Sequence, residues 1–196
     1  MTASDLRRLV YVVGATVDGF IAGPAGEIDF YPLTDDVVAL LATELADTLP
    51  AHARAQLGAT GPPQRFDTVV MGRVTYEPAL ELGITSPYAP RRQLVVSRTL
   101  DDAPDPEVEI VRGDPVAAVR AVKAESGGDI LLVGGGRLAG TLLAEIDELI
   151  VKVYPVLAGV GVPMFAAPFT PTALTLRTSR VLQRGTVVLT YDLVRT

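Results

Sequence analysis

The sequence predicts an α/β fold with a mixed, mostly parallel sheet, helices on both faces and a C-terminal antiparallel hairpin. Three observations support this prediction. Apolar, β-branched runs alternate with helical patterns between residues 67 and 154, and strands separated by helices pair in parallel through crossovers. The first run, Leu9–Gly14, is apolar throughout, as expected for a strand buried on both faces. Two strand patterns near the C-terminus are separated only by Gln183-Arg184-Gly185, which indicates a hairpin.

The composition is that of an ordinary globular protein. A chain of 196 residues is long enough for one well-packed domain and short for two, so we expect a single domain over residues 1–196. Hydrophobic residues make up 48% and charged residues 20% of the chain, unlike a disordered protein. No apolar run approaches the roughly 20 residues that span a bilayer, and segment 1–8 lacks a signal-peptide core. We therefore expect a cytoplasmic protein without a membrane partner.

Charge and side-chain chemistry narrow the classes of function. The net charge is −6 without any basic run, so we expect no nucleic-acid partner, because such binding draws on clustered lysine and arginine. The chain has no cysteine and one histidine, His52, which removes disulfides, thiolate nucleophiles and metal sites rich in cysteine or histidine. The chemistry must therefore come from carboxylates, hydroxyls, arginines or a bound cofactor.

The first part of the chain predicts one strand and one helix. Strand Leu9–Gly14 leads into a glycine-rich loop over residues 15–26 that we expect to be mobile. Helical spacing then runs from Asp35 to Leu49, with Thr34 or Asp35 as the cap. We interpret the Gly/Pro-rich stretch 58–64 as a loop rather than a domain linker, because the first strand still needs partners in the sheet.

The rest of the chain predicts alternating strands and helices. Asp114-Pro115 supplies a helix cap followed by proline at the first helical position, and Gly127-Gly128 is a stop signal for that helix. The other expected helices are Thr75–Leu82 and Leu138–Ile146. The hairpin is expected to join Leu174–Leu182 to Thr186–Val194. The expected strands before it are Thr68–Met71, Gln93–Ser97, Val108–Val111, Ile130–Val133 and Glu148–Tyr154.

Two of these strands run into glycine turns that open helices. One turn is Gly72-Arg73-Val74-Thr75, and the other is Gly134-Gly135-Gly136-Arg137-Leu138. Each turn brings free backbone N–H groups, a helix N-terminus and an arginine to the carboxyl end of a strand, which suits an anion such as phosphate. One such turn is weak evidence, because glycine after a strand is mostly turn chemistry. Two in one sheet favour a ligand with several phosphates, and a nucleotide cofactor is the natural candidate.

The residues around the turns favour NADPH over other nucleotides. The second turn fits the pattern G-x-G-x-x-A, but the next strand ends in Tyr154-Pro155 instead of the acid of a Rossmann domain. No P-loop is present. Arg73 and Thr75 begin one helix, and Ser97-Arg98 ends the following strand at the same sheet edge. Two arginines and two hydroxyls there suit an extra 2′-phosphate. In the alternative interpretation, Arg98 is solvated and Thr75 only caps its helix.

These segments resemble a known family. Met71–Glu77, Val96-Ser97-Arg98 and Val133–Gly136 look like the dihydrofolate reductase superfamily. The closer resemblance is to the RibD C-terminal domain, the reductase domain of riboflavin biosynthesis, and to its stand-alone relatives. Thr16–Ala22 resembles that branch's Ser-Leu-Asp-Gly-x-Ile-Ala, and Ile146–Leu149 followed by Tyr154–Phe165 resembles its "Asp-Glu-Leu … Pro-x-x-x-Gly-x-Gly-x-Pro-x-Phe" ending. The match covers nearly the full length, in order.

The resemblance implies an NADPH-binding fold that moves a hydride to a small heterocyclic or carbonyl-like substrate. The implied phosphate-binding residues are Gly72, Arg73 and Thr75, with Ser97 and Arg98 near the 2′-phosphate. The pyrophosphate would be bound by the second turn, which consists of Gly134, Gly135, Gly136, Arg137 and Leu138. Ala15 would lie against the nicotinamide. Asp18 matches the family's loop aspartate beside the substrate pocket, and is the candidate catalytic residue. Its alternative is a turn residue before Gly19.

Two other functions stay open. The first is 5-amino-6-(5-phosphoribosylamino)uracil reductase of riboflavin biosynthesis, although Glu27–Gln64 shows no basic cluster for a ribose phosphate. The second is a non-catalytic nucleotide-binding protein on the same fold. The carboxylate of dihydrofolate reductase has only loose positional counterparts in Asp29, Asp35 and Asp36, so antifolate-type chemistry is not supported.

One segment predicts a homodimer. Ala158–Thr172 is apolar and Gly/Pro-rich without a helical or strand period, which suits a surface buried against a partner. The family resemblance points the same way. In the alternative interpretation, this segment is a loop packed on its own domain.

Overall fold

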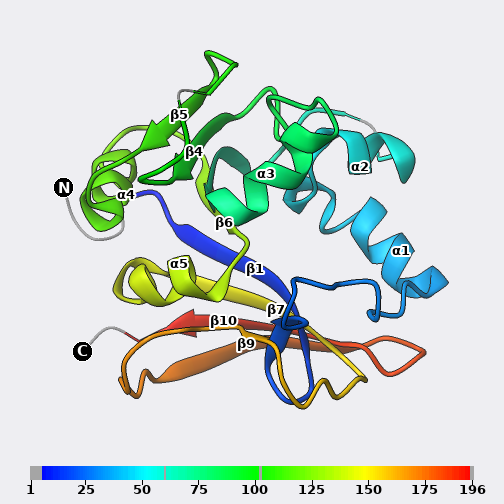
Figure 1. Cartoon of the computed structure of the whole chain (residues 1–196). Helices are drawn as coiled ribbons and strands as arrows, with labels where there is room; N and C mark the ends of the chain where they lie inside the picture. Colours follow the sequence, from blue (N-terminus) through cyan, green and yellow to red (C-terminus); the bar gives the residue numbers. More distant parts are fainter. Residues whose placement is uncertain (1–5, 60, 102, 195–196) are drawn as a thin grey trace.

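The computed structural model describes residues 6–59, 61–101 and 103–194 (Figure 1). The main sheet contains β1 (Leu9–Thr16), β3 (Phe66–Gly72), β4 (Arg92–Val96), β5 (Val108–Val111), β6 (Asp129–Val133), β7 (Glu148–Tyr154), β9 (Leu174–Val181) and β10 (Val187–Leu193). Its strand order is β5-β4-β3-β6-β1-β7-β10-β9. Pairing is parallel from β5 to β7 and antiparallel from β7 through β10 to β9. The predicted mixed sheet with a C-terminal hairpin is confirmed.

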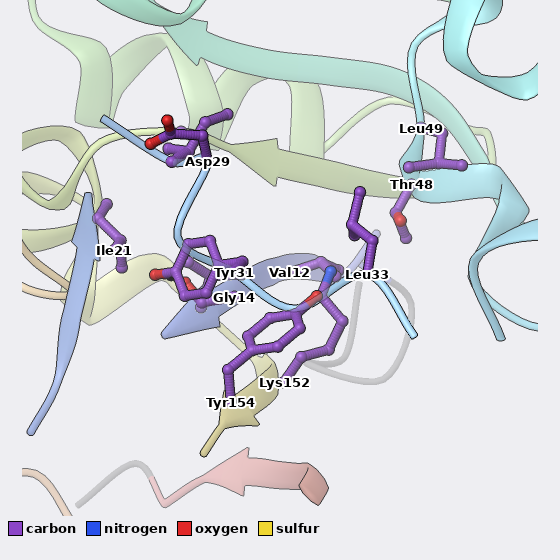
Figure 2. Close-up of a pocket in the computed structure, with 13 residues that line it drawn as sticks. Val12, Gly14, Ile21, Asp29, Tyr31, Leu33, Thr48, Leu49, Lys152 and Tyr154 are labelled. Atoms are coloured by element: carbon purple, nitrogen blue, oxygen red, sulfur yellow. Dashed lines mark hydrogen bonds between the residues drawn. The ribbon is translucent and has the colours of Figure 1, made fainter. Parts of the chain in front are cut away.

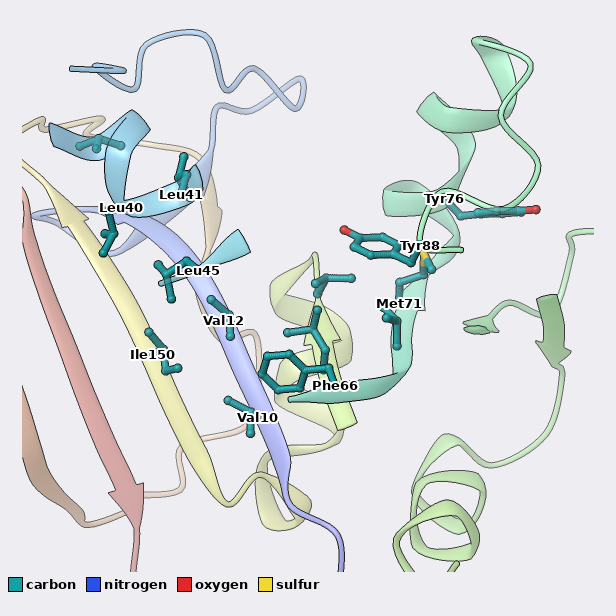
Figure 3. Packing of buried hydrophobic residues seen from close by; sticks show 14 of the residues in the cluster. Val10, Val12, Leu40, Leu41, Leu45, Phe66, Met71, Tyr76, Tyr88 and Ile150 are labelled. Atoms are coloured by element: carbon teal, nitrogen blue, oxygen red, sulfur yellow. The ribbon is translucent and has the colours of Figure 1, made fainter. Parts of the chain in front are cut away.

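Helices cover both faces of this sheet. They are α1 (Asp35–Ala42), α2 (Ala51–Gln56), α3 (Arg73–Glu81), α4 (Pro115–Lys123) and α5 (Gly136–Thr141), with 3-10 turns η2 (Ala46–Thr48) and η3 (Leu143–Glu145). On one face, Val10 and Val12 of β1 share a buried cluster with Leu40 of α1 and Tyr76 of α3 (Figure 3). The alternate β1 residues, such as Tyr11, pack on the other face with side chains of α4 and α5. Burial on both faces explains the continuous apolar run of β1.

The parallel pairing positions the candidate site. Because β4, β3, β6, β1 and β7 are neighbours that run in one direction, their carboxyl ends lie along one edge of the sheet. Adjacent strands are typically ~4.8 Å apart, so groups at the ends of neighbouring strands can contact one ligand. No helix in the described ranges has the length and apolar character needed to cross a membrane.

The expected helix from Asp35 to Leu49 is wrong in its second half. Helix α1 stops at Ala42, and the chain continues into η2. The Asp47 carboxylate accepts hydrogen bonds from the backbone N–H groups of Gln64, at 2.5 Å, and Arg65, at 2.7 Å. These contacts tie η2 to the start of β3. Tertiary contacts therefore override a helical pattern that is correct up to residue 42.

Other boundaries also differ. Asp114 caps α4 as predicted, with its carboxylate accepting from the Val116 N–H at 2.9 Å, but α4 ends at Lys123 rather than at Gly127. The expected helix Leu138–Ile146 is divided into α5 and η3. The loop after β1 contains a short strand that we did not predict, β2 (Phe20–Ala22), which pairs with β8 (Val162–Pro163).

Candidate cofactor and substrate site

The turn after β3 leaves the start of α3 open. Gly72 is the N-cap of α3, and a Cβ atom there would meet no atom within 4 Å. Arg73 is exposed; its Nη1 donates to Thr99 Oγ1 at 3.0 Å, and its Nε lies 3.4 Å from Glu77 Oε1. The space beside Gly72 is therefore open, and a helix N-terminus favours an anion such as a ligand phosphate.

The turn after β6 contacts the turn after β3. Gly134 has a φ of +97°, which favours glycine, and a Cβ there would lie 1.9 Å from Thr75 Oγ1. A Cβ on Gly136 would lie 2.0 Å from the carbonyl oxygen of Pro163, whereas one on Gly135 would meet no atom within 4 Å. Gly134 and Gly136 therefore allow the turn to pack closely against Thr75 and Pro163, whereas the space beside Gly135 is open.

The two residues after the glycines have different surroundings. Leu138 is buried in the core beside α4. Arg137 is exposed, and its guanidinium makes no hydrogen bond or ion pair within the described part of the chain. Leu138 thus anchors α5, while Arg137 is free to contact an anion at the turn.

Tyr11 supports the second turn through its hydroxyl group, a role that we did not predict from the sequence. Its hydroxyl lies within hydrogen-bond distance of the carbonyl oxygens of Gly134, at 3.1 Å, and Met164, at 3.2 Å. Burial raises the pKa of Tyr11, so the hydroxyl stays neutral and donates. A tyrosine in an otherwise aliphatic buried strand was the available signal, because a buried hydroxyl needs a partner.

The carboxyl end of β4 presents Ser97 and Arg98 next to the first turn. Val96 pairs with Gly72 in the sheet. Ser97 is buried, and its Oγ accepts from the backbone N–H groups of Thr99, at 3.2 Å, and Leu100, at 2.9 Å. Arg98 is exposed and unpaired within the described residues. Ser97 therefore organises the turn, and Arg98 supplies a free cation beside Gly72.

The end of β1 carries Ala15, which is buried, and the loop residue Asp18. The Asp18 carboxylate accepts from Thr16 Oγ1 at 2.5 Å and from the backbone N–H groups of Gly159, at 2.7 Å, and Ala158, at 3.1 Å. These hydrogen bonds, the one from Thr16 first, lower the pKa of Asp18 to about 2. An ionised carboxylate that ties two loops together is poorly suited to proton donation at neutral pH. Its catalytic assignment stays a prediction.

A cavity of about 400 Å³ lies beside the ends of β1 and β6, between Gly14 and Gly134 (Figure 2). Its walls are mostly apolar. Its polar side chains are Asp29, Tyr31, Thr48, Lys152 and Tyr154. Of the three acids considered as counterparts of the reductase carboxylate, only Asp29 lines this cavity.

Two tyrosines form one wall of the cavity. The rings of Tyr31 and Tyr154 lie 4.6 Å apart, centre to centre. The Tyr31 hydroxyl donates to the carbonyl oxygen of Phe20 at 2.9 Å, and burial raises the pKa of Tyr31 to about 12. A Cβ on Gly14 would lie 2.9 Å from the Tyr154 ring. Gly14 therefore makes room for this wall, a role that its place inside an apolar strand did not reveal.

The predicted cofactor residues follow the order of the strands. Along the edge, β4 carries Ser97 and Arg98, β3 carries Gly72, Arg73 and Thr75, β6 carries Gly134 to Leu138, and β1 carries Ala15. The next strand, β7, carries Lys152 and Tyr154 of the cavity. The structure brings all these residues to one edge, with the cavity at the β1–β7 end.

Comparison with known proteins places this geometry in a family. The family model described as the RibD C-terminal domain matches residues 7–189. The chain is 29% identical to the uncharacterised protein YwjB of Bacillus subtilis (strain 168) over 173 residues, 87% of this chain and 90% of YwjB. It is 25% identical to YyaP of the same organism over 198 residues, covering 94% of each chain.

Solved structures share the fold. A putative riboflavin biosynthesis protein from Shewanella sp. PV-4 is similar with a TM-score of 0.73 and 24% identity, covering 96% of this chain and 99% of that one. Dihydrofolate reductase from Enterococcus faecalis, in complex with NADP(H), is similar with a TM-score of 0.62 and 16% identity, covering 95% and 96%. Because the family model spans nearly the whole chain, this protein belongs to the RibD C-terminal domain family.

Proposed function

We propose that this protein is an NADPH-dependent reductase that transfers a hydride to a small heterocyclic or carbonyl-like substrate. The observation that carries the proposal is the order of groups along the sheet edge. Exposed arginines and open glycine turns lie on β4, β3 and β6, and the cavity follows at β1 and β7. A dinucleotide along the first three strands would bring its reactive ring beside the cavity.

The residues present fit the phosphates of such a cofactor. Gly72 and Gly135 leave open space at the starts of α3 and α5, so backbone N–H groups are accessible to phosphate oxygens. Arg73, Arg98 and Arg137 are exposed at the same edge and supply charge-assisted hydrogen bonds. When bound, NADPH supplies the hydride, and the protein supplies position and electrostatics.

The chain's own residues have distinct proposed roles. Thr75 and the Gly134 turn bind the pyrophosphate, and Ala15 packs against the nicotinamide. Tyr11 holds the carbonyl of Gly134 in place. The mostly apolar cavity limits water around the reacting groups, and the Asp18 carboxylate ties the loop after β1 to the backbone of Ala158 and Gly159.

The pyrimidine reductase of riboflavin biosynthesis is the second candidate, and the family supports it. A structural relative from Thermotoga maritima, with a TM-score of 0.66 and 13% identity, bears the name diaminohydroxyphosphoribosylaminopyrimidine deaminase/5-amino-6-(5-phosphoribosylamino)uracil reductase, and this chain covers 58% of it. The cavity weighs against this substrate here, because its lining contains one basic side chain, Lys152, whereas a phosphate group usually draws on several donors.

The function is tested in two steps. NADPH fluorescence titration first measures cofactor binding, and loss of NADPH absorbance is then followed with quinones, ketones, pterins and the phosphoribosylamino-pyrimidine. We expect saturable binding and turnover of at least one substrate. Binding without any turnover would favour the non-catalytic nucleotide-binding protein, and no binding would contradict the proposal. With a substrate in hand, unchanged turnover in Asp18→Asn would remove the catalytic role of Asp18.

We also propose that the protein forms a homodimer. Part of the expected interface packs on its own chain, since Val162–Pro163 pairs with β2 and Phe165 contacts the Tyr11 ring edge-on. Within the same segment, Phe169 is 96% exposed. Just after the segment, β9 is exposed along its whole length, including Leu176. These apolar side chains suit a second copy of the chain. A monomeric mass by light scattering at micromolar concentration would contradict the proposal.

A further inference from the structure

Lys152 occupies an unusual place for a lysine. It lies near the carboxyl end of β7, where it pairs with Gly14 of β1 on one side and Val188 of β10 on the other. Its side chain lines the cavity together with Tyr154 (Figure 2). A Cβ on Gly14 would lie 3.8 Å from Lys152 Cε. The side chain therefore lies over the end of β1, close to the position proposed for the nicotinamide.

The Lys152 ammonium has no partner in the described part of the chain. It makes no hydrogen bond and no ion pair there. The other lysine of the sequence, Lys123, is buried but paired: its Nζ lies 2.6 Å from Asp147 Oδ2 and donates to the Glu145 carbonyl at 2.9 Å. A half-buried cation without a partner costs stability, so its retention in a cavity points to a ligand.

The groups that share the cavity do not neutralise this ammonium. Asp29 lies on the far side of the cavity in Figure 2 and forms no ion pair with it. Tyr31 and Tyr154 are neutral at pH 7, because burial raises the pKa of each. Burial also lowers the pKa of Lys152 to about 8. The ammonium is thus charged at neutral pH and incompletely solvated.

We propose that Lys152 binds an anionic oxygen of the substrate, so that this site takes small, mainly apolar molecules with one carboxylate or enolate group. This inference rests on the proposed reductase function, because the cavity adjoins the cofactor turn at Gly134. The single cation suits one negative charge, and the apolar walls suit a ring. A volume of about 400 Å³ lies at the small end of ligand pockets.

The experiment uses benzoate as the probe and benzamide as its neutral control, with and without saturating NADPH. Lysine-selective ¹³C labelling gives signals from only two lysines, so Lys123 serves as an internal reference. We expect benzoate to bind about tenfold or more tightly than benzamide, the energy of one charge-assisted contact. The Lys152 signal should move on binding and its titration midpoint should rise above about 8, while the Lys123 signal stays in place.

Two variants make the result specific. Lys152→Met should weaken benzoate about tenfold or more and leave benzamide within about twofold, whereas Lys152→Arg should keep the preference for benzoate. Thermal unfolding of each variant verifies that it is folded. Equal or undetectable binding of the two probes, or an unmoved Lys152 signal, would overturn the proposal. Failure of NADPH to bind in the same samples would overturn the reductase function instead, since the titrations without NADPH test Lys152 by themselves.

Discussion

The two ends of the central sheet use charge in opposite ways. At the amino ends of the strands, charged side chains pair with one another. Glu148 is only 2% exposed. Its Oε2 atom lies 2.9 Å from Arg65 Nη2 and 3.1 Å from the Nη1 atoms of both Arg8 and Arg177. At the carboxyl ends, the Arg98 and Arg137 guanidiniums and the Lys152 ammonium have no partner among the described residues. Paired charges at one end stabilise the fold, and unpaired charges at the other are available for a ligand.

The largest expected effect is at the paired end. Glu148→Gln leaves three arginines around a neutral group, and breaking such a buried ion pair costs about 3–5 kcal/mol. Urea unfolding at pH 7 should show this loss, while NADPH affinity of the folded variant stays unchanged. The control is Glu44→Gln in an exposed pair with Arg180, which should cost less than about 1 kcal/mol. Equal losses in the two variants would contradict the distinction between the ends.

The glycines of the second turn separate stability from binding. A Cβ on Gly135 meets open space, and Gly135 has a φ of −68° that alanine adopts readily. Gly135→Ala should therefore keep the unfolding free energy within about 1 kcal/mol and weaken NADPH about a hundredfold, because the methyl group fills the phosphate's space.

Gly136→Ala is the matched comparison at the same turn. Its Cβ would lie 2.0 Å from the Pro163 carbonyl oxygen, so this variant should lose stability as well as affinity. Calorimetric titration and urea unfolding of both variants measure the two quantities. If Gly135→Ala binds NADPH like the wild type, the turn does not hold the pyrophosphate.

Removing an unpaired arginine should affect binding alone. Arg98→Ala should weaken NADPH about ten- to a hundredfold, since a charge-assisted contact is worth about 1.5–3 kcal/mol. NADH, which lacks the 2′-phosphate, should be affected less. Arg73→Ala is expected to weaken both cofactors if Arg73 also contacts the pyrophosphate. Calorimetric titration of both variants with both cofactors gives the four changes in affinity relative to the wild type. An equal loss of affinity for NADH and NADPH in Arg98→Ala would contradict the assignment of the 2′-phosphate to the end of β4.

The smallest expected effect contrasts the two lysines. Lys152→Met should leave the unfolding free energy unchanged or raise it by up to about 1 kcal/mol, because it removes a cation without a partner. Lys123→Met removes one partner of Asp147 and should lower the unfolding free energy by about 1–3 kcal/mol. Chemical denaturation of both variants gives the comparison. A large loss of unfolding free energy in Lys152→Met would indicate that this lysine stabilises the fold instead of serving to bind a ligand.

The sequence predicted the local features of the sheet's carboxyl edge better than the contacts between distant segments. The glycine turns are local patterns, and each contains the glycines, the arginine and the helix start within a few residues. The pair of Arg65 with Glu148 joins positions 83 residues apart, and the cavity joins Gly14, Tyr31 and Lys152 from separate elements. No local pattern encodes such contacts. The break after α1 had the same cause, since it depends on Asp47 reaching the start of β3.

The central claim is that the carboxyl edge from β4 to β6 binds a cofactor with a 2′-phosphate. Calorimetric titration of the wild-type protein with NADPH and with NADH tests it most directly. The unpaired Arg98 beside Gly72 predicts that NADPH binds at least about tenfold more tightly, as one charge-assisted contact requires. Equal affinity for NADH and NADPH would contradict the assignment of this edge to the 2′-phosphate.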